Sequence, residues 1–218
     1  MEMRTRELDG LMTDSRLALI FAGGWRLSSL VTVVLGFCGP KSCAEAELPL
    51  AELSALRLDG DVYALGDGFC SLNEPEGPAL RARAVLGSRS GRMIAELGTA
   101  AWIWGASPTM PLSHELCADH ALRSRPAARS ALTVREVRFD PSDVASLDGA
   151  RVTIPLRTAV DLARFRSDYS ETDAAVAREL ARLGGFTVGD CLALMDRRPN
   201  LLEKRRARTR LTAALRDS

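Results

Sequence analysis

The sequence has few aromatic residues and few histidines, and it lacks most motifs by which enzymes are recognised. Phe, Trp and Tyr make up 5% of its 218 residues, which argues against an aromatic surface for stacking nucleic-acid bases. The two histidines, His114 and His120, have no H-E-x-x-H or Cys/His spacing typical of zinc sites. The motifs G-x-x-x-x-G-K-[ST], G-x-G-x-x-G and G-x-S-x-G are also absent. We therefore expect a binding protein that is not an enzyme and uses no metal ion or other cofactor.

Cysteine usage indicates a reducing, cytoplasmic setting. The five cysteines cannot all pair, and no two have the C-x-x-C spacing. Cys70, Cys117 and Cys191 have the surroundings of small buried residues, whereas Cys38 and Cys43 fall in an expected loop and helix start.

An apolar stretch over residues 17–38 resembles a targeting segment only superficially. Gly23-Gly24 and Arg26 divide it into pieces shorter than the ~20 residues that a membrane span requires. Acidic residues precede it, where the start of a secretory signal would be basic. We expect two buried helices here, no signal peptide and no membrane partner.

Basic and acidic residues nearly balance, at 29 and 28, but they are unevenly distributed along the chain. Segments 1–80 and 139–196 carry net charges of −6 and −4, whereas 81–138 and 197–218 carry +5 and +6. A partner senses charge within about one Debye length, so these local values matter more than the total of +1.

Residues 1–74 are predicted to form a winged helix-turn-helix domain. Capping and stop residues predict helices over 15–22, 28–35 and 42–58, the last broken or restarted at Pro49. Two β-prone runs around Gly66-Asp67-Gly68 then predict a hairpin. Three helices and a hairpin are the winged-helix order, which a small helical domain with a β-arm would share.

A DNA-binding role for this domain meets an electrostatic difficulty. Affinity for DNA comes largely from phosphate contacts, yet Glu45, Glu47 and Glu52 lie in the expected recognition region. Either a dimer uses a narrow basic edge, or the domain mainly contacts protein. The candidate DNA-contacting residues are Arg4, Arg6, Arg26, Ser28, Ser29, Lys41, Ser42 and Arg57.

A turn-rich joint at residues 73–78 (NEPEGP) marks the predicted boundary with a second domain, residues 79–218. We expect that domain to fold and act without the first. It should contain a helix over 79–86 and an apolar helix over 97–105, in which Trp102 and Trp104 cannot share a face. We expect one Trp in the core and the other on an interdomain or partner surface. Strands are predicted over 112–117, 132–139 and 151–154.

Four helices are predicted to follow these strands. Pro155 suits the first position of a helix over 156–165, in which Arg157 and Asp161 can pair. Capping-box patterns predict starts at Ser170-x-x-Asp173, Thr187-x-x-Asp190 and Asn200-x-x-Glu203. Gly184-Gly185 and Pro199 are the stop signals. The apolar stripe expected on the last helix is Leu202, Ala207, Leu211, Ala214 and Leu215.

Three stretches resemble a known family. The segments are ASLDGARVTIPLRTAVDLARF (145–165), GTAAWIWG (98–105) and the helical tail that begins TDAAVARELARLGGF (172–186). They are similar to AbiEi-type antitoxins of type IV toxin–antitoxin systems. The resemblance implies an α+β protein: an N-terminal winged helix, then a mixed α/β antitoxin domain with a helical C-terminal tail. It also implies that the first domain binds DNA of its own promoter as a repressor, and that the second counteracts a nucleotidyltransferase toxin.

Two hypotheses about the function stay open. One is a transcription-regulating antitoxin; the other is a protein-interaction module acting on the toxin without DNA binding. Related proteins add a nuclease-like domain, which we do not expect in a chain ending at Ser218. We expect a monomer or weak dimer. The candidate partner-binding residues are Arg123, Arg125, Arg129, Lys204, Arg205, Arg206, Arg208 and Arg210, although a solvated basic helix face is the commoner arrangement.

Overall fold

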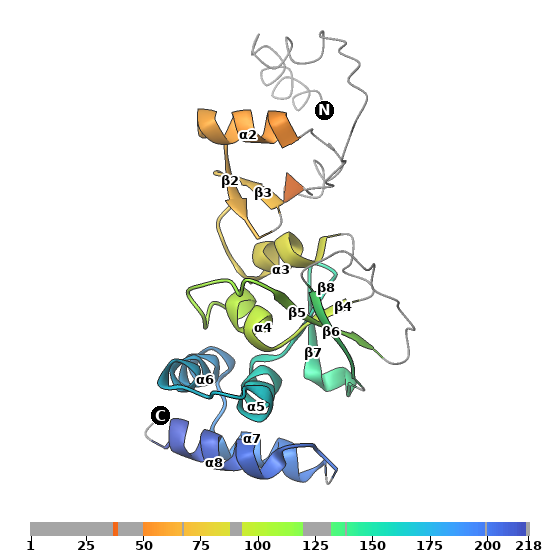
Figure 1. Cartoon of the computed structure of the whole chain (residues 1–218), viewed down its shortest axis with the longest axis vertical. Coiled ribbons are helices and arrows are strands. Elements are labelled where there is room, and N and C mark those ends of the chain that lie inside the picture. The colour runs from red at the N-terminus through yellow and green to blue at the C-terminus, as the bar shows by residue number, and fades with distance from the viewer. Residues whose placement is uncertain are drawn as a thin grey trace, which may run out of the picture. The chain divides into compact units, whose positions relative to one another are not determined.

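The computed structural model describes residues 37–38, 50–66, 68–87, 93–119, 132–137, 139–198 and 200–216. The chain divides into two compact units, residues 1–33 and 34–218, and all described residues belong to the second. Helices and strands are mixed along this unit, which confirms the predicted α+β class (Figure 1). Its first elements are β1 (Phe37–Cys38), α2 (Leu50–Asp59), β2 (Val62–Leu65), β3 (Gly68–Ser71) and α3 (Pro78–Leu86).

The predicted hairpin is present. Strands β2 and β3 pair antiparallel, with Val62 opposite Ser71 and Leu65 opposite Gly68. Strand β1 adds to β3 in parallel, so Cys38 lies in a strand and not in the expected loop. The helices predicted over 15–22 and 28–35, and the start of the third, lie outside the described residues. Helix α2 covers the part of that predicted third helix that follows Pro49, and the winged helix as a whole stays a prediction.

A five-stranded mixed sheet follows, in the order β6-β5-β4-β8-β7. The predicted strands at 112–117, 132–139 and 151–154 are confirmed as β5, β6 and β8, with ends shifted by one or two residues. Strands β4 and β7, of three and four residues, were not predicted. The elements are β4 (Met93–Ala95), α4 (Leu97–Trp104), β5 (His114–Asp119), β6 (Leu132–Val137), the 3-10 turn η3 (Pro141–Asp143), β7 (Val144–Leu147) and β8 (Ala150–Thr153).

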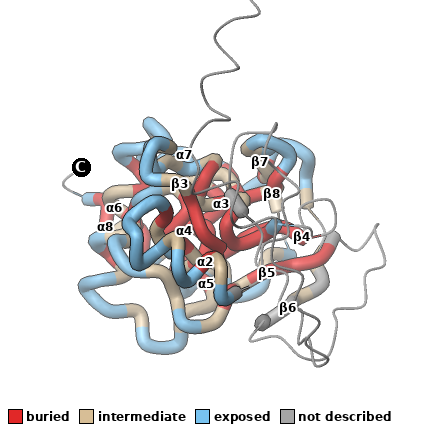
Figure 2. The backbone as a smooth tube through the Cα atoms, turned by 90° about the horizontal axis from the view of Figure 1, so that it is seen from above, coloured by how far each residue is buried: buried red, intermediate tan, exposed pale blue. Residues whose placement is uncertain are grey.

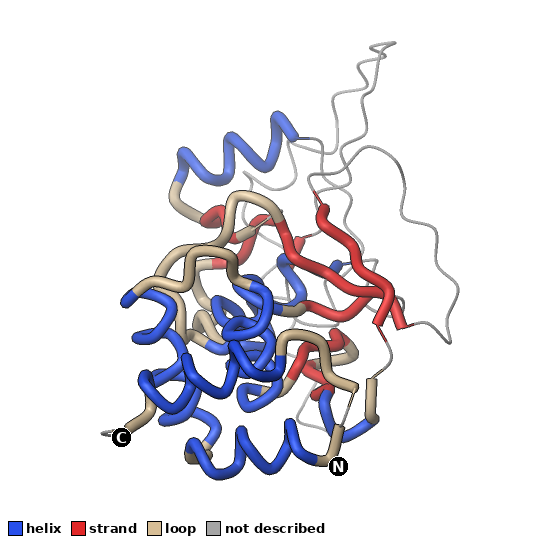
Figure 3. The backbone as a smooth tube through the Cα atoms, turned by 60° about the horizontal axis from the view of Figure 1, so that its bottom comes forward, coloured by secondary structure: helices blue, strands red, loops and turns tan. Residues whose placement is uncertain are grey.

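The four C-terminal helices gather on one side of this sheet (Figure 3). Ser170 and Thr187 both form the predicted capping boxes. Gly185 ends its helix at φ 61°, a left-handed conformation that favours glycine. The last helix was predicted from Asn200 but begins after Glu203, which makes no side-chain cap. The helices are α5 (Pro155–Phe165), α6 (Glu171–Gly184), α7 (Val188–Asp196) and α8 (Lys204–Ala214).

Two large apolar clusters and a small third one form the core of this unit: the first includes residues of α3, α4 and β4, the second lies mainly among α5–α8, and the third is Leu53, Val62 and Phe69. Buried backbone runs through the middle of the unit around α3, α4 and β4 (Figure 2). Trp102 lies in the first cluster and is 5% exposed, as predicted for one of the two tryptophans. Trp104, the tryptophan expected on an interdomain or partner surface, is half-buried. It packs against both clusters, and its Nε1 donates a hydrogen bond to Thr153 O at 2.8 Å.

The hairpin β2–β3 contributes to the first cluster. Leu65 and Cys70 are buried together with Leu80 and Val85 of α3. The predicted joint at 73–78 therefore connects segments that share a core. Of the helices described, none is long and apolar enough to cross a membrane.

Candidate partner interface

Helix α8 packs on α5, α6 and α7 through the apolar side predicted for it, except at its start. Ala207, Leu211, Ala214 and Leu215 are buried in the second cluster. Leu202 was expected in the same stripe but is 66% exposed, because it lies in the turn before the helix rather than on its apolar face. The five basic residues of α8 stand around the remaining circumference, and their surroundings differ.

Lys204 and Arg208 connect α8 to α7. Both contact Asp196 Oδ1, with Nζ and Nη1 each 2.9 Å away. These hydrogen bonds hold the pKa of the Asp196 carboxyl below its usual range. Part of the charge of both side chains is thus matched within the chain.

Arg210 stabilises the C-terminal end of α5. Its Nη1 donates to Ala163 O at 3.0 Å and to Arg166 O at 2.7 Å, and its Nη2 donates to Ser167 O at 3.2 Å. The guanidinium also lies 5.0 Å from the ring centroid of Tyr169. The last carbonyls of a helix lack partners within the helix and carry partial negative charge, so an arginine there is favourable. This residue was a candidate partner contact, and the structure gives it an internal role as well.

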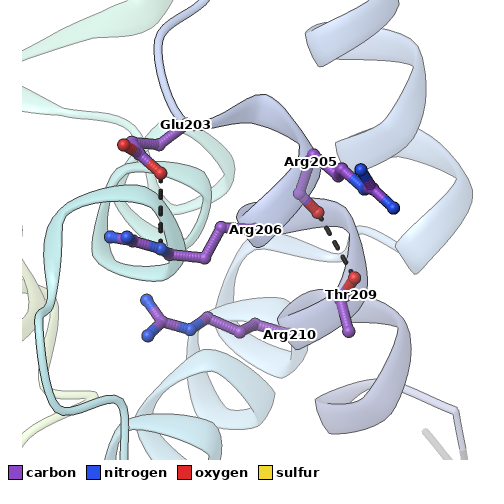
Figure 4. Close-up of a pocket in the computed structure, with 5 residues that line it drawn as sticks. All are labelled: Glu203, Arg205, Arg206, Thr209 and Arg210. Atoms are coloured by element: carbon purple, nitrogen blue, oxygen red, sulfur yellow. Dashed lines mark hydrogen bonds and ion pairs between the residues drawn. The ribbon is translucent and has the colours of Figure 1, made fainter.

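Arg205 and Arg206 line an open hollow of about 460 Å³, together with Glu203, Thr209 and Arg210 (Figure 4). Arg206 pairs with Glu203 at 3.3 Å, and both side chains are substantially exposed. In Figure 4, Arg206 and Arg210 point to the same side of the helix, whereas Arg205 points away from them. Arg205 is exposed and has no ion pair with any residue that the structure describes. These two arginines are the basic groups of α8 that are least committed to the fold.

A second hollow of about 320 Å³ adjoins the first, since Thr209 and Arg210 line both. Its basic side chain from α6 is Arg178, which pairs with the exposed Glu171 at 2.5 Å and reaches Ala214 O at 3.5 Å. The Tyr169 hydroxyl has no hydrogen-bond partner among the described residues. Burial, and then the charge of Asp173, raise the pKa of Tyr169 to about 12, so its hydroxyl stays protonated at neutral pH.

A buried ionic network lies between the sheet edge and the C-terminal helices. Asp161 accepts from Arg157 Nε at 2.7 Å and from Arg164 Nη1 at 2.6 Å. Asp143 of η3 accepts from Arg157 Nη1 and Arg198 Nη2, each at 2.6 Å. Burial alone would lower the pKa of Arg157, but Asp161 and Asp143 more than offset it and raise the pKa. The network fastens α5 to η3 and to the residues after α7.

The Arg157–Asp161 pair confirms the structural role predicted for Arg157. Arg164 lies three residues after Asp161, so the sequence spacing could also have predicted the Arg164–Asp161 pair. Asp143 and Arg198 were missed because they are distant in sequence, and no local pattern connects them to α5. The network also positions the start of α8, because Arg164 Nε donates to Leu202 O at 2.7 Å.

A family model described as the AbiEi antitoxin C-terminal domain matches residues 93–212, more than half of the chain. The chain belongs to this family. As an AbiEi antitoxin it has an antitoxin role in a toxin–antitoxin system, which implies a toxin as its partner. A search of curated proteins found no match. The matched region begins at β4 and ends within α8, so it contains the sheet, the ionic network and most of both hollows.

The glycine that begins the motif at 98–105 lies against the ends of two charged side chains, those of Glu115 and Arg166. The Gly98 amide donates to Glu115 Oε2 at 2.7 Å, and Arg166 Nη2 lies 3.3 Å from the same oxygen. A Cβ on Gly98 would lie 2.6 Å from Arg166 Nη2, closer than real contacts allow. The motif thus brings the start of α4 against β5 and the end of α5.

Of the remaining predicted site residues, Arg57 is described by the structure and the others are not. Arg57 lies exposed in the last turn of α2. The other candidate DNA contacts, Arg4, Arg6, Arg26, Ser28, Ser29, Lys41 and Ser42, lie outside the described residues, as do Arg123, Arg125 and Arg129. Within the described part of the antitoxin, no group of three or more His, Cys, Asp or Glu side chains is arranged to hold a metal ion.

Proposed function

We propose that this antitoxin counteracts a nucleotidyltransferase-type toxin and represses its own operon by binding promoter DNA. The match of residues 93–212 to the antitoxin domain supports the first part and is the observation that carries the proposal. The exposed α8 face supports a role in binding rather than catalysis. Its arginines border open hollows, and the serine that lines the second hollow, Ser170, is engaged in the capping box of α6.

Co-expression tests the antitoxin part. Cells that express the cognate nucleotidyltransferase toxin should stop growing, and cells that also express the chain should resume growth. Continued arrest, with the chain shown to be folded and present in excess, would remove this part of the proposal.

Repression is supported by the helix α2 and the hairpin β2–β3, which suit the end of a winged helix, and by the exposed Arg57. Phosphate contacts should make promoter binding weaken steeply as salt rises. A gel-shift titration of a promoter fragment with the full chain, at two salt concentrations, measures this. Absence of a salt-sensitive complex at micromolar protein would exclude repression through direct DNA contact.

The alternative is a protein-interaction module that acts on the toxin without binding DNA. Helix α2 favours it, because the single basic residue Arg57 is accompanied by Glu52 and Asp59 on the same helix. Growth rescue together with a negative gel shift would select this alternative. Growth rescue together with a salt-sensitive shift would select the repressor.

A further inference from the structure

We infer that the hairpin β2–β3 fastens α2 to the antitoxin domain and does not contact promoter DNA as a wing; this rests on the proposed repression. In a winged helix that uses its wing, the turn of the hairpin is the part that reaches the DNA. Here the turn end of the hairpin lies against α3, and α2 lies at the opposite end (Figure 1). Promoter DNA would therefore meet the described part of this unit at α2.

The turn of the hairpin fits closely against α3. Gly66 begins the turn with φ 59°, and a Cβ placed on it would lie 3.3 Å from Ala84 O and 3.4 Å from Ala84 Cβ. On either side of the turn, Leu65 and Cys70 are buried in the same apolar cluster as Val85. A turn packed this closely on α3 cannot also lie against a DNA backbone.

The segment that follows the hairpin is held to the same domain by two arginines of α3. Arg81 Nε donates to Glu76 Oε1 at 2.7 Å. Arg83 pairs with Glu74 and also with Asp148 in the β7–β8 turn, where Nη1 and Oδ2 lie 3.3 Å apart. Both glutamates belong to the predicted joint, so the joint is attached to α3 along its length and does not leave the hairpin free to turn toward DNA.

The hairpin also lacks the charge that a DNA-contacting wing needs. Residues 61–72 contain no Lys or Arg, and their charged residues are Asp61 and Asp67. Affinity for DNA comes largely from cations at phosphates, which carboxylates repel. The one Lys or Arg between residues 50 and 72 is Arg57, which lies exposed in the last turn of α2. Packing and charge thus both assign DNA contact to the α2 end of the hairpin.

An engineered disulfide between the turn and α3 tests this assignment in the full-length chain. The 3.4 Å between a Cβ on Gly66 and the Ala84 Cβ is near the spacing of about 3.8 Å found in disulfides. The double variant Gly66→Cys with Ala84→Cys is oxidised by glutathione disulfide, which is itself reduced to two thiols for each link formed. Peptide mapping locates the link, because the chain has five cysteines of its own. The reduced form of the same protein and an oxidised Ala84→Cys single variant are the matched controls.

The link should form in most molecules, and the linked and reduced forms should bind a promoter fragment with Kd values within about twofold of each other. A hairpin that must leave α3 to reach DNA would be trapped by the link. Loss of promoter affinity by about tenfold or more in the linked form, reversed by reductant and absent from the single variant, would overturn the inference. A folded double variant that forms no link would also overturn it, because the turn would then not lie on α3.

Charge substitutions give a second measurement that does not depend on the conformation of the turn. Ala64 is exposed on β2, and Ala64→Arg adds a cation to the hairpin that should leave promoter affinity and its salt dependence unchanged. Arg57→Gln should weaken binding and reduce the slope of log K against log salt by about one. Tighter binding with a steeper slope for Ala64→Arg, or no change for Arg57→Gln, would contradict the assignment to α2.

The outcomes separate this inference from the proposed function. A parent chain that binds no promoter DNA would overturn the repression and the assignment of DNA contact to α2, whereas growth rescue would still test the antitoxin role. Promoter binding by the parent chain that is lost in the linked form would keep the repression and overturn the inference alone.

Discussion

Asp161 receives an arginine on each of its carboxylate oxygens while only 1% of the residue is exposed. Removing one partner of a buried ionic group leaves the other charges without compensation. Asp161→Asn should therefore lower the free energy of unfolding by about 3–5 kcal/mol, measured by denaturant titration. The exposed Asp168 is a matched control, and Asp168→Asn should change stability by less than about 0.5 kcal/mol. Equal effects of the two substitutions would show that the network does not stabilise the fold.

The buried cysteines predict how thiols react in the native protein. Cys70, Cys117 and Cys191 are all buried and are thiols rather than halves of a disulfide among the described residues. Burial raises the pKa of Cys191 to about 12 and that of Cys117 further, so neither forms the reactive thiolate near pH 8. A disulfide reagent at that pH should modify at most two of the five cysteines in the folded chain and all five after unfolding. Rapid reaction of three or more in the folded chain would contradict the described burial.

At the scale of single helices, substitution should show that some basic residues of α8 stabilise the fold and that others do not. Arg210→Gln removes the donors that stabilise the end of α5 and should cost about 1–3 kcal/mol. Arg205→Gln removes the same charge from a side chain without an ion pair among the described residues, and glutamine keeps helix propensity. Thermal unfolding of the two variants should show a lower melting temperature for the first only. A similar loss in both would mean that general charge, not the carbonyl contacts, stabilises α8.

The same helices show what local sequence determines. Ser170 and Thr187 fix helix starts through side chains three residues apart, so the capping boxes were readable in the sequence. Asn200 offers the same spacing, yet α8 starts after Glu203, because Arg164 bonds the Leu202 carbonyl from α5. A contact across 38 residues overrides the local signal there. The second hollow escaped prediction for a similar reason, since Tyr169 and Arg178 meet α8 only through tertiary packing.

At the scale of the whole molecule, the shared core predicts how the chain tolerates truncation. Leu65 and Cys70 of the hairpin are buried against α3, and each fully buried apolar side chain contributes about 1.5–3 kcal/mol. A fragment of residues 61–218 should therefore melt at a higher temperature than a fragment of residues 79–218, which lacks the hairpin. Equal melting temperatures would show that the joint at 73–78 separates independent domains, as the sequence alone predicts.

The central claim is that this chain protects cells from a nucleotidyltransferase toxin. The most direct measurement holds the toxin at a fixed level and raises expression of the full chain in steps, counting viable cells at each step. Viability should rise from arrest to that of toxin-free cells as the chain increases, and the Asp161→Asn variant should require more expression for the same rescue, since less of it is folded. Viability that stays at the arrested level across the whole range, with folded chain detected in the cells, would contradict the account.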